Sequence, residues 1–161
     1  MEQYLSFQLD QEVFALEIAH VREVLDYIPI THVPRTPDVL VGVINLRGLV
    51  IPIIHLKKAL NIATDYVIEK SCFVIAEVEY NSESLVVALL ADQVKEVLEF
   101  NNSEILPLPS VGVKLNTNYL KGMKKVAEGF VLILNINDVL NSLELNAASL
   151  LTQNQATSPE S

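Results

Sequence analysis

The chain has 161 residues, of which 50% are hydrophobic and only 19% are charged, and its formal net charge is −9. A chain of this length forms one domain or two small modules that share a boundary. The acidic balance, without any basic stretch, argues against binding to nucleic acid or to anionic membranes.

Three further features predict a soluble cytoplasmic protein. The one cysteine, Cys72, rules out an internal disulfide and fits a reducing compartment. The first residues, Met-Glu-Gln-Tyr-Leu, lack the basic region of a signal peptide. No uninterrupted apolar run reaches the roughly 20 residues that span a bilayer, so we expect no direct membrane insertion.

Strand patterns dominate the first half of the chain. Apolar and polar residues alternate with a period of two, which is typical of half-buried strands. Tight turns are expected at Asp10-Gln11 and Arg47-Gly48, and prolines mark a loop after the third strand. The predicted strands cover 4–9, 14–18, 21–25, 41–46 and 49–56, with one helical turn at 57–61.

The second half repeats this order and ends differently. A turn is expected at Asn81-Ser82, and residues 101–118 form a long irregular loop. The predicted strands cover 72–78, 85–90, 94–98, 119–126 and 130–135. Apolar residues three or four apart then predict a helix over 136–151, capped by Asn135 or Asn137. We expect the polar tail, 152–161, to be disordered.

The two halves are copies of one unit. Val21-Arg-Glu-Val-Leu25 recurs as Val94-Lys-Glu-Val-Leu98, 73 positions later, and Leu40-Val-Gly42 recurs as Leu120-Lys-Gly122, 80 positions later. The unit is longer than the roughly 20 to 50 residues of a solenoid repeat and indicates a duplicated small barrel. We expect an all-β domain over 1–150, with a first barrel at about 1–66, a second at about 71–146, and ends free to cross between them.

Catalytic and metal-binding patterns are absent from the sequence. There is no phosphate-binding glycine loop and no Gly-x-Ser-x-Gly, and His20, His32 and His55 occur at no metal-ligand spacing. We predict no catalytic residue, no metal and no cofactor, and Cys72 as a small buried hydrophobe. A hydrolase that brings His20, His55 and Cys72 into one pocket is a remote alternative. His55, at a strand end, is either bonded to the backbone or a pH sensor.

Glu23 and Arg47 each interrupt an apolar strand or hairpin. They form either an exposed ion pair worth about 0–1 kcal/mol or an ion pair at the rim of a protein interface. The second copy has Glu96 at the position of Glu23, but its hairpin at Glu128-Gly129 has no arginine. The two copies therefore present different surfaces.

These segments closely resemble CheW, the family of chemotaxis coupling proteins. The most specific block is Gly42-Val-Ile-Asn-Leu-Arg-Gly48, and the resemblance covers about 3–145. The other matching segments are 21–25, 30–34, 36–37, 51–54, 115–122 and 133–140. The resemblance implies two pseudo-symmetric five-stranded SH3-like barrels, without catalytic activity or a cofactor, in an adaptor at membrane-associated receptor arrays.

The resemblance also implies partners and a site. The partners are the regulatory domain of the histidine kinase CheA, itself CheW-like, and the cytoplasmic tip of methyl-accepting chemoreceptors. Kinase and coupling-protein domains alternate in rings that join the receptors. The residues carried over as partner-binding are Val21, Glu23, Gly42, Arg47, Gly48, Cys72 and Phe73.

One position departs from the family pattern. Family members commonly have Asp where His55 stands, followed by Leu-Arg instead of Leu-Lys. The departure raises the alternative of an adaptor in a related pathway, such as pilus-based surface motility. A fused receiver domain would add roughly 120 residues, so a stand-alone adaptor is the simplest interpretation.

Overall fold

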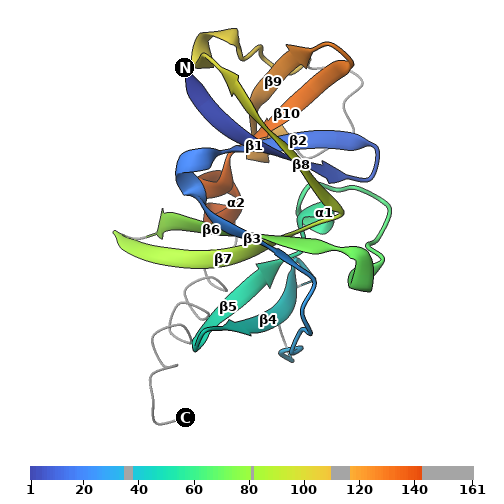
Figure 1. Ribbon diagram of the computed structural model, residues 1–161, viewed down its shortest axis with the longest axis vertical. Helices are drawn as coiled ribbons and strands as arrows, with labels where there is room; N and C mark the ends of the chain where they lie inside the picture. The colour runs from blue at the N-terminus through green and yellow to red at the C-terminus, as the bar shows by residue number, and fades with distance from the viewer. Residues whose placement is uncertain (35–37, 81, 110–116, 143–161) are drawn as a thin grey trace.

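The computed structural model describes residues 1–34, 38–80, 82–109 and 117–142, and most of them lie in two five-stranded sheets (Figure 1). In spatial order, one sheet consists of β8 (Gln93–Phe100), β1 (Glu2–Leu9), β2 (Glu12–Glu17), β10 (Gly129–Leu134) and β9 (Leu120–Val126). The other consists of β3 (Val21–Asp26), β6 (Cys72–Tyr80), β7 (Glu83–Ala91), β5 (Leu49–Ile54) and β4 (Leu40–Leu46). The predicted all-β fold of two pseudo-symmetric SH3-like barrels is confirmed.

Short helices connect the strands. The α-helices are α1 (Leu56–Ala59) and α2 (Ile136–Ser142), and the 3-10 helices are η1 (Ile18–His20), η2 (Ile68–Lys70), η3 (Asn102–Glu104) and η4 (Thr117–Tyr119). The backbone N–H of Asp138 donates to Asn135 Oδ1 at 3.2 Å, so Asn135 is the cap of α2. The rest of the predicted helix, 143–151, and the tail 152–161 lie outside the described residues. No helix in the described part of the chain is long and apolar enough to cross a membrane.

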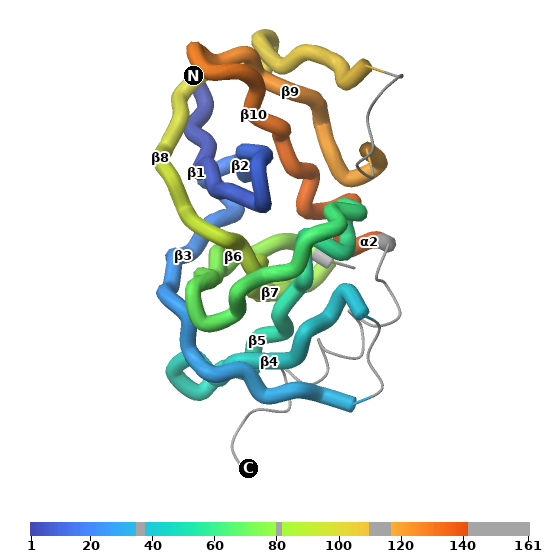
Figure 2. Tube along the Cα trace, turned by 90° about the vertical axis from the view of Figure 1, so that its right-hand side faces the viewer, coloured from blue at the N-terminus to red at the C-terminus, as the bar shows by residue number. Residues whose placement is uncertain are grey.

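The barrels exchange strands between the two sequence copies. Each strand of the first copy has an equivalent five strands later, so that β1 corresponds to β6 and β5 to β10. Replacing every strand by its equivalent converts the strand order of one sheet into that of the other. Each sheet therefore takes two strands from one copy and three from the other, and the chain passes between the barrels in both views (Figures 1 and 2). The ranges 1–66 and 71–146 describe the two copies along the chain, whereas each barrel in space contains strands from both.

Two parallel strand pairs join the copies. In one barrel, Ala15 of β2 is paired with Ile133 of β10, and in the other, Ala88 of β7 is paired with Ile53 of β5. Ala15 and Ala88 are repeats of one another, as are Ile53 and Ile133. Each copy thus supplies one strand to each parallel pair, and the partners are far apart in sequence, as parallel pairing requires.

The main core is continuous across the two sheets. Phe7 and Phe14 from one sheet and Phe73 from the other are fully buried in the same hydrophobic cluster. A smaller cluster lies at the far end of the first sheet, where the rings of Tyr4 and Phe100 stack with their centroids 4.3 Å apart. Shared burial of this kind makes the two barrels one folding unit.

Two equivalent glycines allow each barrel to close. A Cβ at Gly42 would overlap the carbonyl oxygen of Thr31, and a Cβ at Gly122 would overlap that of Leu106. Next to these glycines, Thr31 and Val43 exchange backbone hydrogen bonds of 2.9 and 2.8 Å. Leu106 and Met123 do the same at 2.7 and 2.9 Å.

We expect Gly42→Ala to lower the free energy of unfolding by about 1–3 kcal/mol, because the new methyl group must displace backbone that is hydrogen-bonded. Gly122→Ala, at the equivalent position, should cost a similar amount. Urea denaturation of both variants measures the effect. Stability equal to wild type for both would show that the close approach is not needed for closure.

Candidate partner-binding grooves

A groove on the second sheet brings Glu23 and Arg47 together. This first groove has a volume of about 240 Å³ and lies between β3, the β4–β5 hairpin and the face of β6 and β7. Its lining residues are Arg22, Glu23, Leu46, Arg47, Leu49, Ile51, Ile75 and Val86. Charged groups therefore border an apolar floor, as in many protein interfaces.

The turn between β4 and β5 positions the arginine. Arg47 has φ 53° and Gly48 has φ 87°, so both central residues of the turn are left-handed, as in the tight turns that match the twist of a hairpin. Asn45 Oδ1 accepts a hydrogen bond of 3.1 Å from the Gly48 N–H. A left-handed conformation is uncommon for a residue with a long side chain, and here it places the guanidinium over β3.

Arg47 and Glu23 form an ion pair, with Arg47 Nη2 donating to Glu23 Oε1. The Arg47 side chain is 68% exposed and that of Glu23 is 31% exposed. An ion pair so open to water contributes only about 0–1 kcal/mol to the stability of the free protein. Its value increases when a partner excludes water from it, so the geometry fits the interface interpretation.

The other predicted site residues differ in accessibility. Gly48 is exposed, Val21 is half-buried and Gly42 is buried in the barrel closure. Phe73 is fully buried beside Tyr27, with the ring centroids 6.4 Å apart, and Cys72 is 8% exposed. Their role in partner binding stays a prediction, and burial restricts the side chain of Phe73 to supporting the strand from within.

The hydrolase alternative has no support from the described residues. Burial raises the pKa of the Cys72 thiol, and its Sγ donates to the carbonyl oxygen of Ala91 at 3.7 Å. His55 makes its side-chain hydrogen bonds with Asp65 and Lys58. Within 1–34, 38–80, 82–109 and 117–142, no three His, Cys, Asp or Glu side chains gather as metal ligands.

A second groove lies at the equivalent place on the first sheet, and the sequence interpretation missed it. It has a volume of about 330 Å³. Its lining residues are Ser6, Val13, Lys95, Glu96, Leu98, Val126, Ala127, Glu128, Phe130 and Val131. The offsets of the repeat relate the two linings, because Lys95-Glu96 follow Arg22-Glu23 by 73 positions and Ala127 follows Arg47 by 80. Projection through the repeat leads from Glu23 to Glu96 and from Arg47 to the second hairpin. The turn predicted there at Glu128-Gly129 lies one residue earlier, at Ala127-Glu128, because Val126 is paired with Gly129.

The two grooves differ in charge and in shape. The first has two arginines and one glutamate in its lining, and the second has one lysine and two glutamates. Ala127 replaces the arginine, and Phe130, 48% exposed, provides an apolar rim. Ser6 occupies the position of Ile75, since each is paired with a repeated alanine, and its hydroxyl donates to the Glu96 carbonyl at 2.7 Å.

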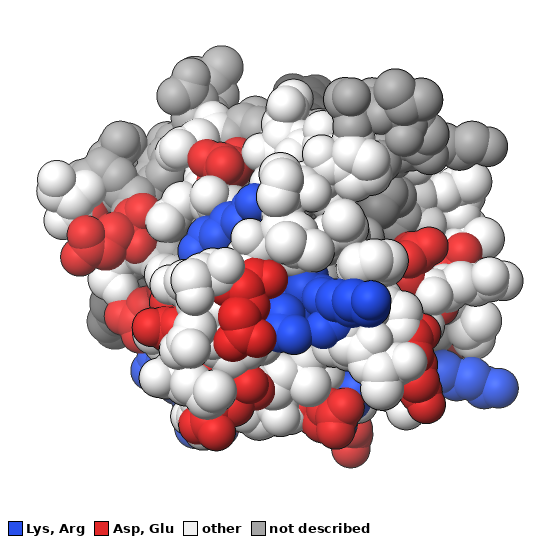
Figure 3. Space-filling model, turned by 90° about the horizontal axis from the view of Figure 1, so that it is seen from above, with Lys and Arg blue, Asp and Glu red and all other residues white. Residues whose placement is uncertain are grey.

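Two lysines of the neighbouring strand β9 form ion pairs. On β9, Lys121 Nζ is 3.2 Å from Glu17 Oε1 and Lys124 Nζ is 3.6 Å from Glu104 Oε1. In the view from above, the blue side chains near the centre lie against red ones (Figure 3). This arrangement leaves no continuous basic surface on the described part of that face, of the kind a phosphate backbone needs.

The two grooves are related by the repeat, differ in charge and lie on one continuous core, an arrangement that suits a scaffold protein. The model of the CheW-like domain family matches residues 3–144, and the chain belongs to this family. It is a chemotaxis coupling scaffold that interacts with chemotaxis signalling proteins.

Relatives in sequence and structure agree with this assignment. The chain is 32% identical over 145 residues to the chemotaxis protein CheW of Klebsiella aerogenes, covering 89% of this chain and 84% of that protein. It is 28% identical to CheW of Rhizobium meliloti, covering 89% of this chain and 90% of that protein. The crystal structure of the scaffolding protein TtCheW from Thermoanaerobacter tengcongensis superimposes with a TM-score of 0.72 at 32% identity, covering 83% of each chain.

We expect the Cys72 thiol to react with a disulfide reagent roughly a hundredfold more slowly in the folded protein than in urea, because the thiol is buried and its pKa is raised. Absorbance after addition of the reagent measures the rate. Ala63→Cys in a Cys72→Ala background provides an exposed control that reacts quickly in the folded state. Equal rates at the two positions would contradict the buried thiol.

Proposed function

We propose that this chain couples the cytoplasmic tip of methyl-accepting chemoreceptors to the regulatory domain of the histidine kinase CheA, and that it does so in the cytoplasm without catalysing a reaction. The observation that carries the proposal is the exposed Arg47–Glu23 ion pair at the rim of the first groove. Nothing in the described fold requires this pair, since its free-state contribution is small. A partner that covers the groove would exclude water from the ion pair and increase its contribution to binding.

The kinase domain is the partner proposed for the first groove. The family resemblance implies that the regulatory domain of the kinase is itself CheW-like, so we expect that domain to contain two related barrels. A groove built from three strands and a hairpin offers room for the hairpin of another such barrel. Apolar residues such as Leu46, Leu49 and Ile51 supply area to bury, and the Arg47 guanidinium supplies bidentate recognition of a carboxylate.

The second groove supports a larger assembly. Its lining has the opposite balance of charge, so the two grooves of one molecule do not select the same surface. One domain contacting a neighbour at each end generates a ring if the rotation closes. A scaffold with two unlike docking surfaces is suited to alternate with a second kind of domain, and receptor state then biases the geometry of the bound kinase through these contacts.

We expect Arg47→Glu to weaken binding of the kinase regulatory domain at least about tenfold, because it places two carboxylates side by side at the rim. Isothermal titration calorimetry measures the affinity, and the urea midpoint should stay near that of wild type. Lys125→Glu makes the same change in charge at an exposed position on β9 and serves as the control.

A charge exchange separates the two roles of the pair. The double variant Glu23→Arg/Arg47→Glu restores an ion pair within the molecule, but the positive and negative charges that a partner meets have exchanged places. It should unfold like wild type and still bind weakly. Failure of the wild-type chain to bind the domain at tens of micromolar would refute the proposed partner, and unfolding of Arg47→Glu alone would make the pair structural.

We expect Phe130→Asp to leave the binary complex with the kinase domain intact and to abolish larger assemblies, because it places a charge on the apolar rim of the second groove. Sedimentation velocity distinguishes binary complexes from larger ones. Val67→Asp adds the same charge at an apolar residue that is 63% exposed and outside both linings, and it is a suitable control. Loss of the binary complex in Phe130→Asp would show that the second groove contacts the kinase domain directly in that complex.

A further inference from the structure

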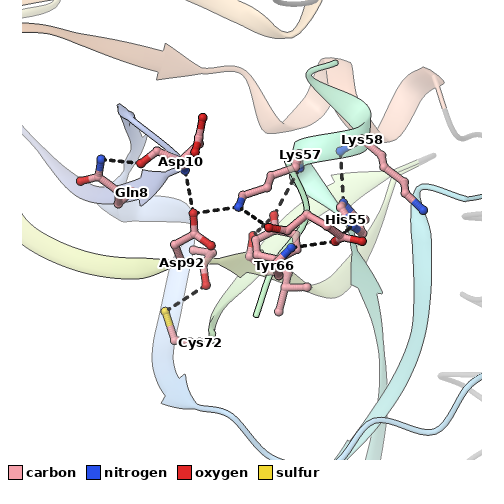
Figure 4. Close-up of polar contacts among 11 residues, drawn as sticks. Gln8, Asp10, His55, Lys57, Lys58, Tyr66, Cys72 and Asp92 are labelled. Carbon is pink, nitrogen blue, oxygen red and sulfur yellow. Dashed lines mark hydrogen bonds and ion pairs between the residues drawn. The ribbon is translucent and has the colours of Figure 1, made fainter. Parts of the chain in front are cut away.

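A polar cluster with a buried lysine and a buried histidine connects the two barrels at α1 (Figure 4). We call it the latch, and its members are His55, Lys57, Asp65, Tyr66 and Asp92. It shares no residue with either groove. Lys57 is 2% exposed and His55 is 6% exposed, although both side chains are polar. Buried polar groups of this kind are retained only where partners satisfy them.

Lys57 ties α1 to the opposite barrel. Its Nζ is 2.9 Å from Asp92 Oδ2, at the junction of β7 and β8. The same Asp92 oxygen accepts a hydrogen bond of 2.6 Å from the Asp10 N–H in the β1–β2 turn, and both contacts are drawn in Figure 4. The ammonium group thus joins the end of β5 in one sheet to a turn of the other, and removing the Asp92 carboxylate would leave the buried charge of Lys57 without its counter-ion.

A loop segment, 61–66, covers the ammonium group. Lys57 Nζ donates to the Asp65 carbonyl oxygen at 3.1 Å and lies 4.4 Å from the centroid of the Tyr66 ring. Tyr66 Oη donates to the carbonyl oxygen of Leu90 at 2.7 Å. Burial strongly raises the pKa of Tyr66, so this hydroxyl stays protonated and keeps donating.

His55 fastens this segment and caps α1. Its Nδ1 accepts a hydrogen bond of 3.1 Å from the Lys58 N–H, so it carries no proton. Its Nε2 is 3.0 Å from Asp65 Oδ1 and therefore carries the one proton of a neutral ring. The second proton of an imidazolium belongs on Nδ1, where it would face the Lys58 N–H and remove the cap.

The latch exists in one copy only. Asn135 is the repeat of His55 and caps α2 in the same way, but an asparagine does not titrate. The repeats of Lys57 and Asp92 are Asn137 and Ala19, both exposed and uncharged, so the Lys57–Asp92 ion pair has no counterpart between them. A titratable cap beside a buried ion pair is thus a feature that the duplication alone does not explain.

We propose that acidification opens this latch: the proton that His55 gains on Nδ1 meets the Lys58 N–H, the ring moves away from the end of α1, and the covering segment moves with it because Asp65 stays bonded to Nε2. The carbonyl oxygen of Asp65 then leaves Lys57, and the tie between the barrels through Lys57 weakens. The inference goes beyond the proposed function, because it concerns neither groove. It makes the local contact between α1, the covering segment and the opposite barrel sensitive to pH, while the shared core stays packed.

The charges around His55 favour this outcome. Desolvation of the buried ring is the main cause that lowers the pKa of His55, and the positive charge of Lys58 acts in the same direction. Asp65 acts in the opposite direction, but its side chain is 74% exposed and screened by water. Lys57 adds a further positive charge on α1, with Asp92 as its own counter-ion, and Asp10 meets Asp92 through its backbone.

The sign of the pH effect follows from the lowered pKa. Between the folded pKa and the ordinary value of about 6.5, the unfolded or opened chain binds the proton and the closed latch does not. The stability of the closed latch is therefore complete above about pH 6.5 and decreases as the pH falls through that window.

Amide hydrogen exchange measured by NMR tests the proposal. Between pH 7.5 and pH 5.5, after correction for intrinsic rates, protection of the Lys58 and Tyr66 amides should fall roughly fivefold, the ratio expected for loss of one helix cap. Protection of Ala88, in a central strand, should stay constant. His55→Asn keeps a capping oxygen and should remove the pH dependence, and His20→Asn should leave it unchanged.

Two results would overturn the inference. One is an equal loss of protection in His55→Asn, which would place the titrating group elsewhere. The other is a uniform loss across all amides, Ala88 included, which would reflect global unfolding instead of a local latch. Kinase binding by His55→Asn at neutral pH should equal that of wild type, so failure here is distinct from failure of the proposed function.

Discussion

The parallel pairing of β2 with β10 and of β5 with β7 is the constraint on which the rest of the structure depends. Each pair joins strands from opposite copies of the repeat, so neither barrel is complete without both halves of the chain. Parallel partners cannot be adjacent in sequence, and here the long excursion between them is occupied by the other barrel. The duplication therefore yields a single domain with exchanged strands and one main core, instead of two separate domains in tandem.

This exchange also determines where the docking surfaces lie. The first groove takes β3 and the β4–β5 hairpin from the first copy but β6 and β7 from the second, and the second groove has the reciprocal composition. A partner in either groove thus contacts both copies at once. Since the floors of the grooves belong to sheets that share a tightly packed core, displacement of one surface is resisted by the other.

Much of the fold was predictable from local patterns in the sequence. Period-two alternation located the strands, and Arg47-Gly48 identified the hairpin turn, since both features depend only on neighbouring residues. The exchange of strands was left open because the pattern of a strand does not specify its partner. Repeated residues such as Ala15 and Ala88 gave the equivalence of the copies, but only the structure shows that each is paired with the other copy's strand.

The site was predicted less completely, for different physical reasons. Glu23 and Arg47 meet as the sequence suggested, because a charge inside an apolar strand has to find a counter-charge or water. The second groove went unnoticed because its arginine is replaced by Ala127, which carries no chemical signal. For His55, the sequence left backbone bonding and pH sensing as alternatives. Its role as a cap depends on a ring orientation set by Asp65, ten residues later.

The differences between the two copies indicate which residues have a role beyond forming the fold. The barrels do not need a charged contact at each junction, because the positions equivalent to Lys57 and Asp92 are the uncharged residues Asn137 and Ala19. Burying Lys57 against Asp92 incurs desolvation that well-packed apolar residues would avoid, so stability alone is a weak reason to retain it. A buried ion pair does fix one arrangement, since shifting the barrels would separate its charges. The asymmetric pair is therefore best understood as a determinant of how two related surfaces are placed, while Arg47 and Ala127 determine what each surface recognises.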